Sequence, residues 1–391
     1  MPDNKCILPW ISMETTPTGG VRPCCLYKGE LKEKIAGKHV PITLKDNTLE
    51  QAFNSKPMDE LRETFEAGKK PGQCERCWIE EDAGKKSKRE YMLEKFKNVP
   101  FEKNLIFLDL KLGNICNLKC RICGEWSSSK WAQEQIERFG DNHVGKQWFE
   151  AGKWPRSSRK FWTNLDKLLP NIKYFEFTGG EPFLIKQHFD LLERAVEKGY
   201  ADDIDIHYNT NGTQFPKQHE VWRHFKHVQI AFSIDNVGDR FEYERDGAKW
   251  TTVNRNIAKF IKMQAEGYPF SLQLCITWNI QNTYYMSEIL TWAKQSGIKD
   301  IHFNLMHDPI EYALVNLPRS AHVEYMHKLD KAIVLHADYS DQIRAIKDIT
   351  LKSPTIETEQ IVNKIKSTDN YRGVHLANTH PEVAELIGYQ T

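Results

Sequence analysis

The sequence predicts an α/β protein whose main domain is an open or partial parallel barrel, and two patterns carry this prediction. From residue 105 onward, short runs rich in β-branched and aromatic residues alternate with longer helical patterns, which is the rhythm of βαβ units. The strand-like runs also have one apolar and one polar face. A chain of 391 residues has room for such a domain and a smaller one beside it.

Six strand-like runs support a parallel sheet. They cover 105–112, 171–178, 203–209, 227–235, 270–278 and 300–306. Helices are expected at about 186–199, 249–266 and 283–296, with Gly199 and Gly297 where a helix end favours glycine. A sheet of antiparallel strands with one solvent-exposed face is the alternative. Helical crossovers between the runs favour parallel neighbours, because hairpins need no such connection.

The alternation within the runs predicts a polar barrel interior. In 203–209 the residues Ile204, Ile206 and Tyr208 share one face, whereas His207 and Asn209 lie on the other. A closed barrel is normally filled by Val, Ile and Leu. We therefore expect the apolar faces to pack on helices and the polar faces to line a cavity that serves as the active site.

The chain divides into three expected parts: a turn-rich domain over 1–99, the barrel over 100–310 and a mostly helical segment over 311–391. The basic run GKKSKRE at 84–90 is interpreted as solvated surface. The balance of 54 Lys+Arg against 53 Asp+Glu does not indicate a nucleic-acid-coating protein. The start has no export signal, and no stretch approaches the roughly 20 apolar residues of a membrane span. We expect a soluble cytoplasmic protein.

Eight of the nine cysteines lie in the first third of the chain, and three of them form a CX3CX2C motif at Cys116, Cys120 and Cys123. In a reducing compartment such thiols are expected to be metal ligands or reactive thiols rather than disulfides. Structural zinc takes four protein ligands, whereas three thiolates can hold three irons of a four-iron cluster and leave the fourth open. The motif follows a predicted strand, so the open iron is expected at the carboxyl end of the sheet.

The motif CNLKCRIC, together with FTGGEPFL at 177–184, resembles the signatures of the radical S-adenosylmethionine (SAM) enzymes. The resemblance covers about residues 1–306 and implies a partial (β/α)6 barrel in which a 4Fe-4S cluster binds SAM. The two glycines allow close backbone approach, and Glu181 or the exposed backbone is expected to receive the SAM ammonium. The resemblance also implies several other cofactor contacts. These are Ile122 near the adenine, Gly179 and Gly180 in the turn, Ser233, Asp235 and Asn209 near the ribose, and Arg245 at the SAM carboxylate or the substrate. The alternative for Arg245 is an exposed helix-surface arginine.

The other N-terminal cysteines resemble the auxiliary-cluster module called SPASM or, in its shorter form, twitch. The resemblance rests on CILPWISMETTPTGGVRPCC and KPGQCERCW. It implies a second 4Fe-4S cluster with four protein ligands, Cys6, Cys24, Cys74 and Cys77. Cys25 is an alternative to Cys24, and a structural zinc site is an alternative to the cluster. In this family the module usually follows the barrel, whereas here it precedes it.

The resemblance implies that a 5′-deoxyadenosyl radical made from SAM oxidises or crosslinks a substrate, with a peptide or protein side chain favoured. A small-molecule enzyme acting on a nucleotide, a sugar or a cofactor precursor is the alternative. A non-catalytic zinc or iron–sulfur scaffold is a third reading. The expected electron donor is a flavodoxin or ferredoxin.

Three side chains on the polar strand faces are candidate catalytic groups: Cys275, Asp109 and His207. Each has a plainer alternative, an inert buried thiol for Cys275 and a hydrogen-bonded wall residue for the other two. Lys111 and Asn304 are further wall candidates. The histidines at 219, 224 and 227 fit a polar helix edge better than a metal site, because neighbouring Lys and Arg side chains repel a cation.

Overall fold

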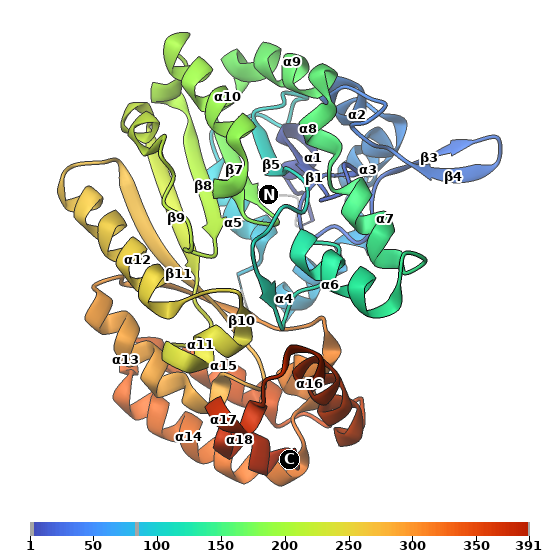
Figure 1. Cartoon of the computed structure of the whole chain (residues 1–391). Helices are drawn as coiled ribbons and strands as arrows, with labels where there is room; N and C mark the ends of the chain where they lie inside the picture. The colour runs from blue at the N-terminus through green and yellow to red at the C-terminus, as the bar shows by residue number, and fades with distance from the viewer. Residues whose placement is uncertain (1–3, 83–85, 390–391) are drawn as a thin grey trace.

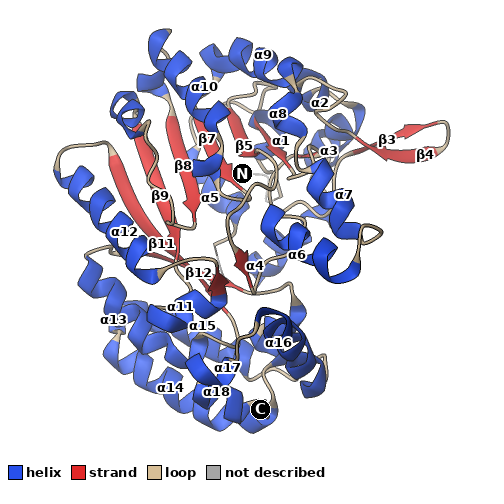
Figure 2. Ribbon diagram, in the orientation of Figure 1, coloured by secondary structure: helices blue, strands red, loops and turns tan. Residues whose placement is uncertain are grey.

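The computed structural model describes residues 4–82 and 86–389, and its centre is an eight-stranded sheet (Figures 1 and 2). The strand order is β12-β11-β9-β8-β7-β5-β1-β2. All six expected strands are present: β5 (Phe107–Lys111), β7 (Tyr174–Thr178), β8 (Asp205–Thr210), β9 (His227–Ser233), β11 (Phe270–Trp278) and β12 (Asp300–Leu305). Each pairs in parallel with its neighbours among them. The predicted partial barrel is confirmed.

The two faces of the sheet differ as the sequence predicts. Buried and half-buried residues alternate along β8 and along β11. The outer, apolar face packs on helices, as where Phe260 of α12 (Trp250–Ala265) lies 5.4 Å from Phe232 of β9, measured between ring centroids. The expected helices α10 (Lys186–Glu197) and α13 (Met286–Ser296) lie along the same outer side (Figure 1). The polar face therefore lines the barrel interior.

The N-terminal segment contributes two strands to this sheet, which the sequence pattern does not predict. Strand β1 (Ser12–Thr15) pairs in parallel with β5, and β2 (Val21–Arg22) pairs antiparallel with β1. Buried residues of the first 99 positions, such as Ile11 and Met13, belong to the same hydrophobic core as Leu108 of the barrel. This part of the first 99 residues therefore packs into the core of the barrel.

The rest of the first 100 residues forms short elements around the edge of the barrel. The helices are α1 (Leu8–Ile11), α2 (Leu49–Phe53), α3 (Lys56–Glu66), α4 (Glu75–Asp82) and α5 (Lys88–Lys95). A hairpin of β3 (Lys32–Ile35) and β4 (Lys38–Pro41) extends away from the body (Figure 1).

Two further groups of helices complete the fold. After β5 the chain forms a two-residue strand β6 (Lys119–Cys120) and the helices α6 (Ser129–Phe139), α7 (Val144–Ala151), α8 (Trp154–Ser157) and α9 (Arg159–Leu168). After β9 come α11 (Gly238–Glu244) and the short strand β10 (Arg245–Asp246), and the C-terminal part is α14 (His322–Leu335), α15 (Ser340–Thr350), α16 (Thr358–Arg372), α17 (Leu376–Thr379) and α18 (Pro381–Leu386). Apolar side chains of α16, α17 and α18 belong to a second core cluster, whereas Leu329 of α14 and Ile343 of α15 belong to the main core. Within the described ranges, no helix has the length and apolar character needed to cross a membrane.

Candidate functional site

The three cysteines of the CX3CX2C motif lie together in the loop after β5, at the carboxyl end of the sheet. Burial, together with the charge of nearby Cys120, raises the pKa of the Cys123 thiol to about 12. The charges of both other thiols also raise the pKa of Cys116. All three are free thiols. The loop therefore gathers three sulfur ligands where parallel α/β sheets carry their active sites.

Backbone contacts hold this cysteine loop in place. Strands β6 and β10 pair antiparallel, with Cys120 opposite Arg245. The Trp131 indole N–H donates to the Cys120 carbonyl oxygen at 2.7 Å, and the Ser128 hydroxyl donates to the Leu118 carbonyl oxygen at 2.6 Å. Because the Leu118 side chain is fully buried, the loop is anchored on both its polar and its apolar side.

The glycine turn after β7 packs directly on the cysteine loop. Gly180 has φ +58°, and a Cβ there would lie 2.3 Å from the Ile115 carbonyl oxygen. The same oxygen accepts a hydrogen bond from the Glu181 amide at 2.7 Å. Only glycine satisfies both the left-handed backbone and this contact. The turn thus positions the residue immediately before Cys116.

The Glu181 carboxylate faces into the protein. One oxygen accepts from the Thr210 hydroxyl at 2.8 Å and the Phe183 amide at 3.1 Å, and the other from the Asn211 amide at 2.7 Å. The side chain is fully buried, and burial raises its pKa to about 7. Either Glu181 or the backbone of the glycine turn was expected to receive the SAM ammonium. Both Glu181 oxygens already accept hydrogen bonds, so only the half-buried backbone of Gly179 and Gly180 is accessible.

Arg245 is buried beside the cysteines, and the alternative that it is an exposed helix-surface residue is wrong. One guanidinium nitrogen lies 3.8 Å from the Cys120 sulfur and another donates to Asp235 at 2.5 Å. Its Nε has no hydrogen-bond partner among the described residues. Asp235 also accepts from the Thr277 amide at 2.9 Å. Asp235, expected at the ribose, is therefore engaged in holding Arg245.

The remaining expected SAM contacts lie on the polar strand faces and within the cysteine motif. Asn209 and Ser233 are half-buried on the polar faces of β8 and β9. Ile122 is half-buried and packs against the C-terminal hydrophobic cluster. These three side chains remain accessible beside the cysteine loop.

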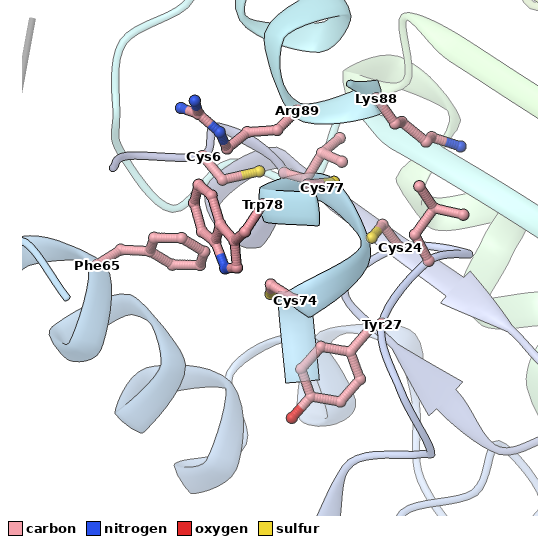
Figure 3. Close-up of a pocket in the computed structure, with 11 residues that line it drawn as sticks. Cys6, Cys24, Tyr27, Phe65, Cys74, Cys77, Trp78, Lys88 and Arg89 are labelled. Atoms are coloured by element: carbon pink, nitrogen blue, oxygen red, sulfur yellow. The ribbon is translucent and has the colours of Figure 1, made fainter. Parts of the chain in front are cut away.

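The four expected auxiliary ligands line one pocket (Figure 3). Cys6, Cys24, Cys74 and Cys77 surround about 340 Å³ of empty space, part of it open to solvent, together with aromatic side chains such as Trp78. Burial, together with the charges of Cys74 and Cys77, raises the pKa of Cys6 to about 12. The four cysteines thus come together from three separate segments of the N-terminal part.

Cys25 is not among the residues that line this pocket. The Lys88 ammonium donates to its sulfur at 2.9 Å, and the carboxylates of Asp109 and Glu176 lie near enough to influence its titration. Geometry therefore groups Cys24, and not Cys25, with the other three thiols. Lys88 belongs to the basic run interpreted as solvated surface, and for this residue that interpretation is wrong. Positions 84 and 85 of the run lie outside the described residues.

Across positions 4–82 and 86–389, no three His, Cys, Asp or Glu side chains converge closely enough to hold a single metal ion. This includes the three thiols of the CX3CX2C motif, the thiols of the N-terminal pocket, and the histidines at 219, 224 and 227.

A row of polar side chains crosses the barrel interior and includes two of the catalytic candidates. In strand register, Glu14, Asp109, Glu176, His207 and Gln229 lie side by side on five adjacent strands. Burial raises the pKa of Asp109 to about 7. His207 is hydrogen-bonded through Nδ1 to the Gln229 side chain at 2.8 Å. Asp109 and His207 therefore belong to one polar network.

The other wall candidates have separate positions. Cys275 lies opposite Ser233, nearer the carboxyl end than the polar row, and burial raises its pKa to about 12. Lys111 bonds Glu14 and lies 3.5 Å from Asp109. Asn304 donates to the Thr277 hydroxyl at 3.4 Å.

Sequence reasoning missed Glu14, Glu176 and Lys88 as parts of the site. For Glu176 the signal was present, since it occupies a polar position of an expected strand. The others become visible only through contacts with residues far along the chain.

Comparisons with known proteins agree with this geometry. A family model described as the Radical SAM superfamily matches residues 110–309. A model described as an iron-sulfur cluster-binding domain, SPASM, matches residues 6–78. A GTP 3',8-cyclase of Vibrio atlanticus (strain LGP32) is 24% identical over 215 residues, which are 53% of this chain and 56% of the cyclase. The match thus spans little more than half of that relative.

Two solved structures are also similar. A histidine-tagged form of anSMEcpe with bound AdoMet is 16% identical with a TM-score of 0.40, covering 68% of this chain and 67% of that one. SuiB of Streptococcus suis bound to S-adenosylmethionine is 15% identical with a TM-score of 0.37, covering 74% of this chain and 51% of that one.

The superfamily match covers just over half of the chain and runs from the end of β5 through β12, with the three-cysteine loop and the glycine turn inside it. With a SPASM match ahead of the barrel, the chain belongs to the Radical SAM superfamily.

Proposed function

We propose that this chain is a radical SAM enzyme with two iron–sulfur clusters. The observation that carries the proposal is the meeting of three free cysteines and the buried Arg245 at the mouth of a barrel with a polar interior. Cys116, Cys120 and Cys123 would hold a 4Fe-4S cluster with one open iron. When bound and reduced, the cluster and SAM supply a 5′-deoxyadenosyl radical that removes a hydrogen atom from the substrate.

The side chains at the mouth fit SAM. The unpartnered Nε of Arg245 is a donor for the SAM carboxylate, and Asp235 holds the guanidinium in place. The backbone of Gly179 and Gly180 can accept from the ammonium. Asn209 and Ser233 are positioned for the ribose, and Ile122 provides apolar contact for the adenine.

The N-terminal pocket would hold the second cluster through Cys6, Cys24, Cys74 and Cys77. Among the described residues these thiols do not converge closely enough to hold a single metal ion, so their spacing suits a multi-iron cluster better than one zinc ion. Arg89, which also lines the pocket, favours the thiolate of Cys6. With four protein ligands this cluster has no open iron, so its role would be to accept an electron from the substrate or to pass one on. The expected external donor is a flavodoxin or ferredoxin.

The substrate proposed first is a peptide or protein side chain, which the enzyme would oxidise or crosslink. Its reacting carbon would lie above the polar row, where Asp109 and His207 can take up or supply protons. The likeness to a GTP 3',8-cyclase favours the second candidate, an enzyme acting on a nucleotide or another small molecule.

The test is anaerobic reconstitution with iron and sulfide, followed by an assay for 5′-deoxyadenosine with SAM and dithionite. Two clusters predict about eight irons per chain. The triple variant Cys116→Ala, Cys120→Ala, Cys123→Ala is expected to retain about four irons and to form no deoxyadenosine. Full iron without SAM cleavage would contradict the radical mechanism and favour a scaffold.

The two substrate classes can be separated with the same assay. Deoxyadenosine formation above the uncoupled rate is measured with unstructured peptides and with nucleoside triphosphates. Stimulation by nucleotides alone would remove the peptide proposal.

A further inference from the structure

Arg121 lies inside the cysteine motif, but its side chain points away from the barrel and toward the C-terminal helices. The guanidinium is almost fully buried. Its Nη2 donates to Asp369 at 2.5 Å and its Nε donates to the Tyr243 carbonyl oxygen at 3.1 Å. The guanidinium also lies over the Tyr243 ring, 3.6 Å from its centroid. The residue next to Cys120 is thus tied to a helix that begins more than 200 positions later.

Asp369 of α16 is the centre of this connection. Besides Arg121, its carboxylate accepts from the Tyr243 hydroxyl at 2.9 Å, the Tyr389 hydroxyl at 2.6 Å and the Leu376 amide at 2.9 Å. The side chain is fully buried. One carboxylate therefore joins the cysteine loop, α11, the start of α17 and the end of the described chain. A buried charge with four donors holds all of them in one arrangement.

One turn further along α16, Arg372 makes a second connection to the same loop. It donates to the Lys119 carbonyl oxygen at 2.9 Å and to both carboxylate oxygens of Glu134. Its guanidinium lies over the Trp131 ring, 4.6 Å from the centroid, and that indole donates to the Cys120 carbonyl oxygen. Helix α16 thus contacts the chain on both sides of Cys120.

A third connection reaches the residue beside Arg245. The His380 ring lies 3.0 Å from the Glu244 carboxylate, and both side chains are buried. The Glu244 carbonyl oxygen accepts from the Arg121 amide at 2.8 Å. Arg372 also lies 3.5 Å from the Asp246 carboxylate of β10, in addition to its bond to Lys119 of β6, so the C-terminal segment contacts both strands that place Cys120 opposite Arg245.

We propose that residues 358–389 form an integral part of the SAM-cluster site, with Asp369 as a positioning residue that holds the cysteine loop through Arg121. This rests on the proposed function only for the identity of the bound cluster. Because docking of the segment and order in the loop depend on each other, loading of the loop with iron should in turn protect the segment.

The first test uses the iron-free chain, so that it does not depend on the proposed chemistry. Asp369→Asn is compared with wild type and with Asp330→Asn, a matched change at an exposed position of α14. Hydrogen exchange is measured by mass spectrometry on peptides covering 116–124 and 6–78. We expect exchange in 116–124 to rise about tenfold or more in Asp369→Asn, with 6–78 unchanged. The Asp330→Asn variant should match wild type in both.

Tyr389→Phe keeps the test valid if Asp369→Asn fails to fold, since it removes only one of the four donors. It should raise exchange in 116–124 by a smaller factor without changing the thermal midpoint of the barrel. Asp369→Glu, which keeps the charge, should restore part of the protection. Unchanged exchange in 116–124 in both Asp369→Asn and Tyr389→Phe would overturn the proposal.

Reconstitution gives the second readout. Asp369→Asn should lose about four of about eight irons while the N-terminal pocket stays loaded, and wild-type 358–389 should exchange more slowly after loading than before. Full iron with wild-type SAM affinity in this variant would contradict the positioning role. A wild type that takes no iron at 116–123 would contradict the proposed function instead, and the exchange data on the iron-free chain would still decide the role of Asp369.

Discussion

The Lys88 ammonium lies 2.9 Å from the sulfur of Cys25 and 3.5 Å from the carboxylate of Glu176. Two consecutive cysteines therefore belong to different surroundings: Cys24 lines the N-terminal pocket, and Cys25 belongs to the polar network of the barrel interior. Lys88 itself lines the pocket as well. The Lys88 side chain therefore contacts both the N-terminal pocket and the polar network of the barrel interior.

Single substitutions of these cysteines should separate their roles. Cys24→Ala removes a thiol from the pocket, so we expect it to lose about four irons after reconstitution. Cys25→Ala is the matched control and should keep the wild-type iron content. Iron per chain and the absorbance of the clusters are the measurements. Loss of iron in Cys25→Ala with retention in Cys24→Ala would reverse the assignment.

The glycine turn should tolerate no side chain at Gly180. An alanine Cβ would meet the Ile115 carbonyl oxygen at 2.3 Å, so Gly180→Ala should displace the residue before Cys116 and lower iron binding at the motif. Gly199→Ala is the control, because Gly199 also has a positive φ but no atom within 4 Å of the added Cβ. Both variants carry backbone strain of about 1–2 kcal/mol. Only Gly180→Ala should lose iron, and equal iron in the two would disprove the contact's importance.

Asp109 should make the stability of the iron-free chain depend on pH. Its pKa is about 7 in the folded chain against an ordinary value of 3.8, because burial disfavours the charged form. The folded state therefore holds a proton that the unfolded state has released, and the free energy of unfolding should fall as pH rises from about 4 to 7. One group contributes at most about 1.4 kcal/mol per pH unit.

Asp109→Asn should remove this part of the slope, which urea unfolding between pH 4.5 and 7.5 can measure. Asp338→Asn, at an exposed position, serves as the control and should keep the wild-type slope. A slope unchanged by Asp109→Asn would mean that Asp109 is ionised when folded.

Arg245 should determine the affinity for SAM. Arg245→Lys keeps a positive charge beside Asp235 but loses the planar fork, so it should fold and bind SAM about tenfold or more weakly. Arg255→Lys, on the exposed side of α12, is the matched control. SAM binding to the reconstituted proteins, followed by the change in the electron paramagnetic resonance signal, is the measurement. Equal affinities would exclude Arg245 as a SAM contact.

The sequence predicts the barrel well because its strands carry a clear period of two. It does not predict β1, whose residues Ser12–Thr15 are all buried and show no alternation. The pairing that makes this segment a strand is with β5, far along the chain. A four-residue run without a period cannot be distinguished from a turn before its partner is known.

The candidate site shows the same division. The three motif cysteines and the polar strand faces follow from spacing and period. The sequence suggests that Lys88 and Arg121 are surface residues, because long cationic side chains usually are. The carboxylates that pair with them inside the protein, Glu176 and Asp369, lie far away in the sequence. For Glu181 and Asp235 the residue type indicated the site, whereas their hydrogen-bond partners depended on the packing of neighbouring strands.

The pairing of β1 with β5 joins two strands that leave the ribosome at different times. The Lys111 amide donates to the Thr15 hydroxyl across 96 positions of sequence, so β1 is made long before the strand it joins. All residues lining the N-terminal pocket, from Cys6 to Arg89, precede the first barrel strand. Every residue that lines this pocket has therefore been synthesised before β5. Strand β1, which pairs with the edge of β5, is also already present when β5 leaves the ribosome.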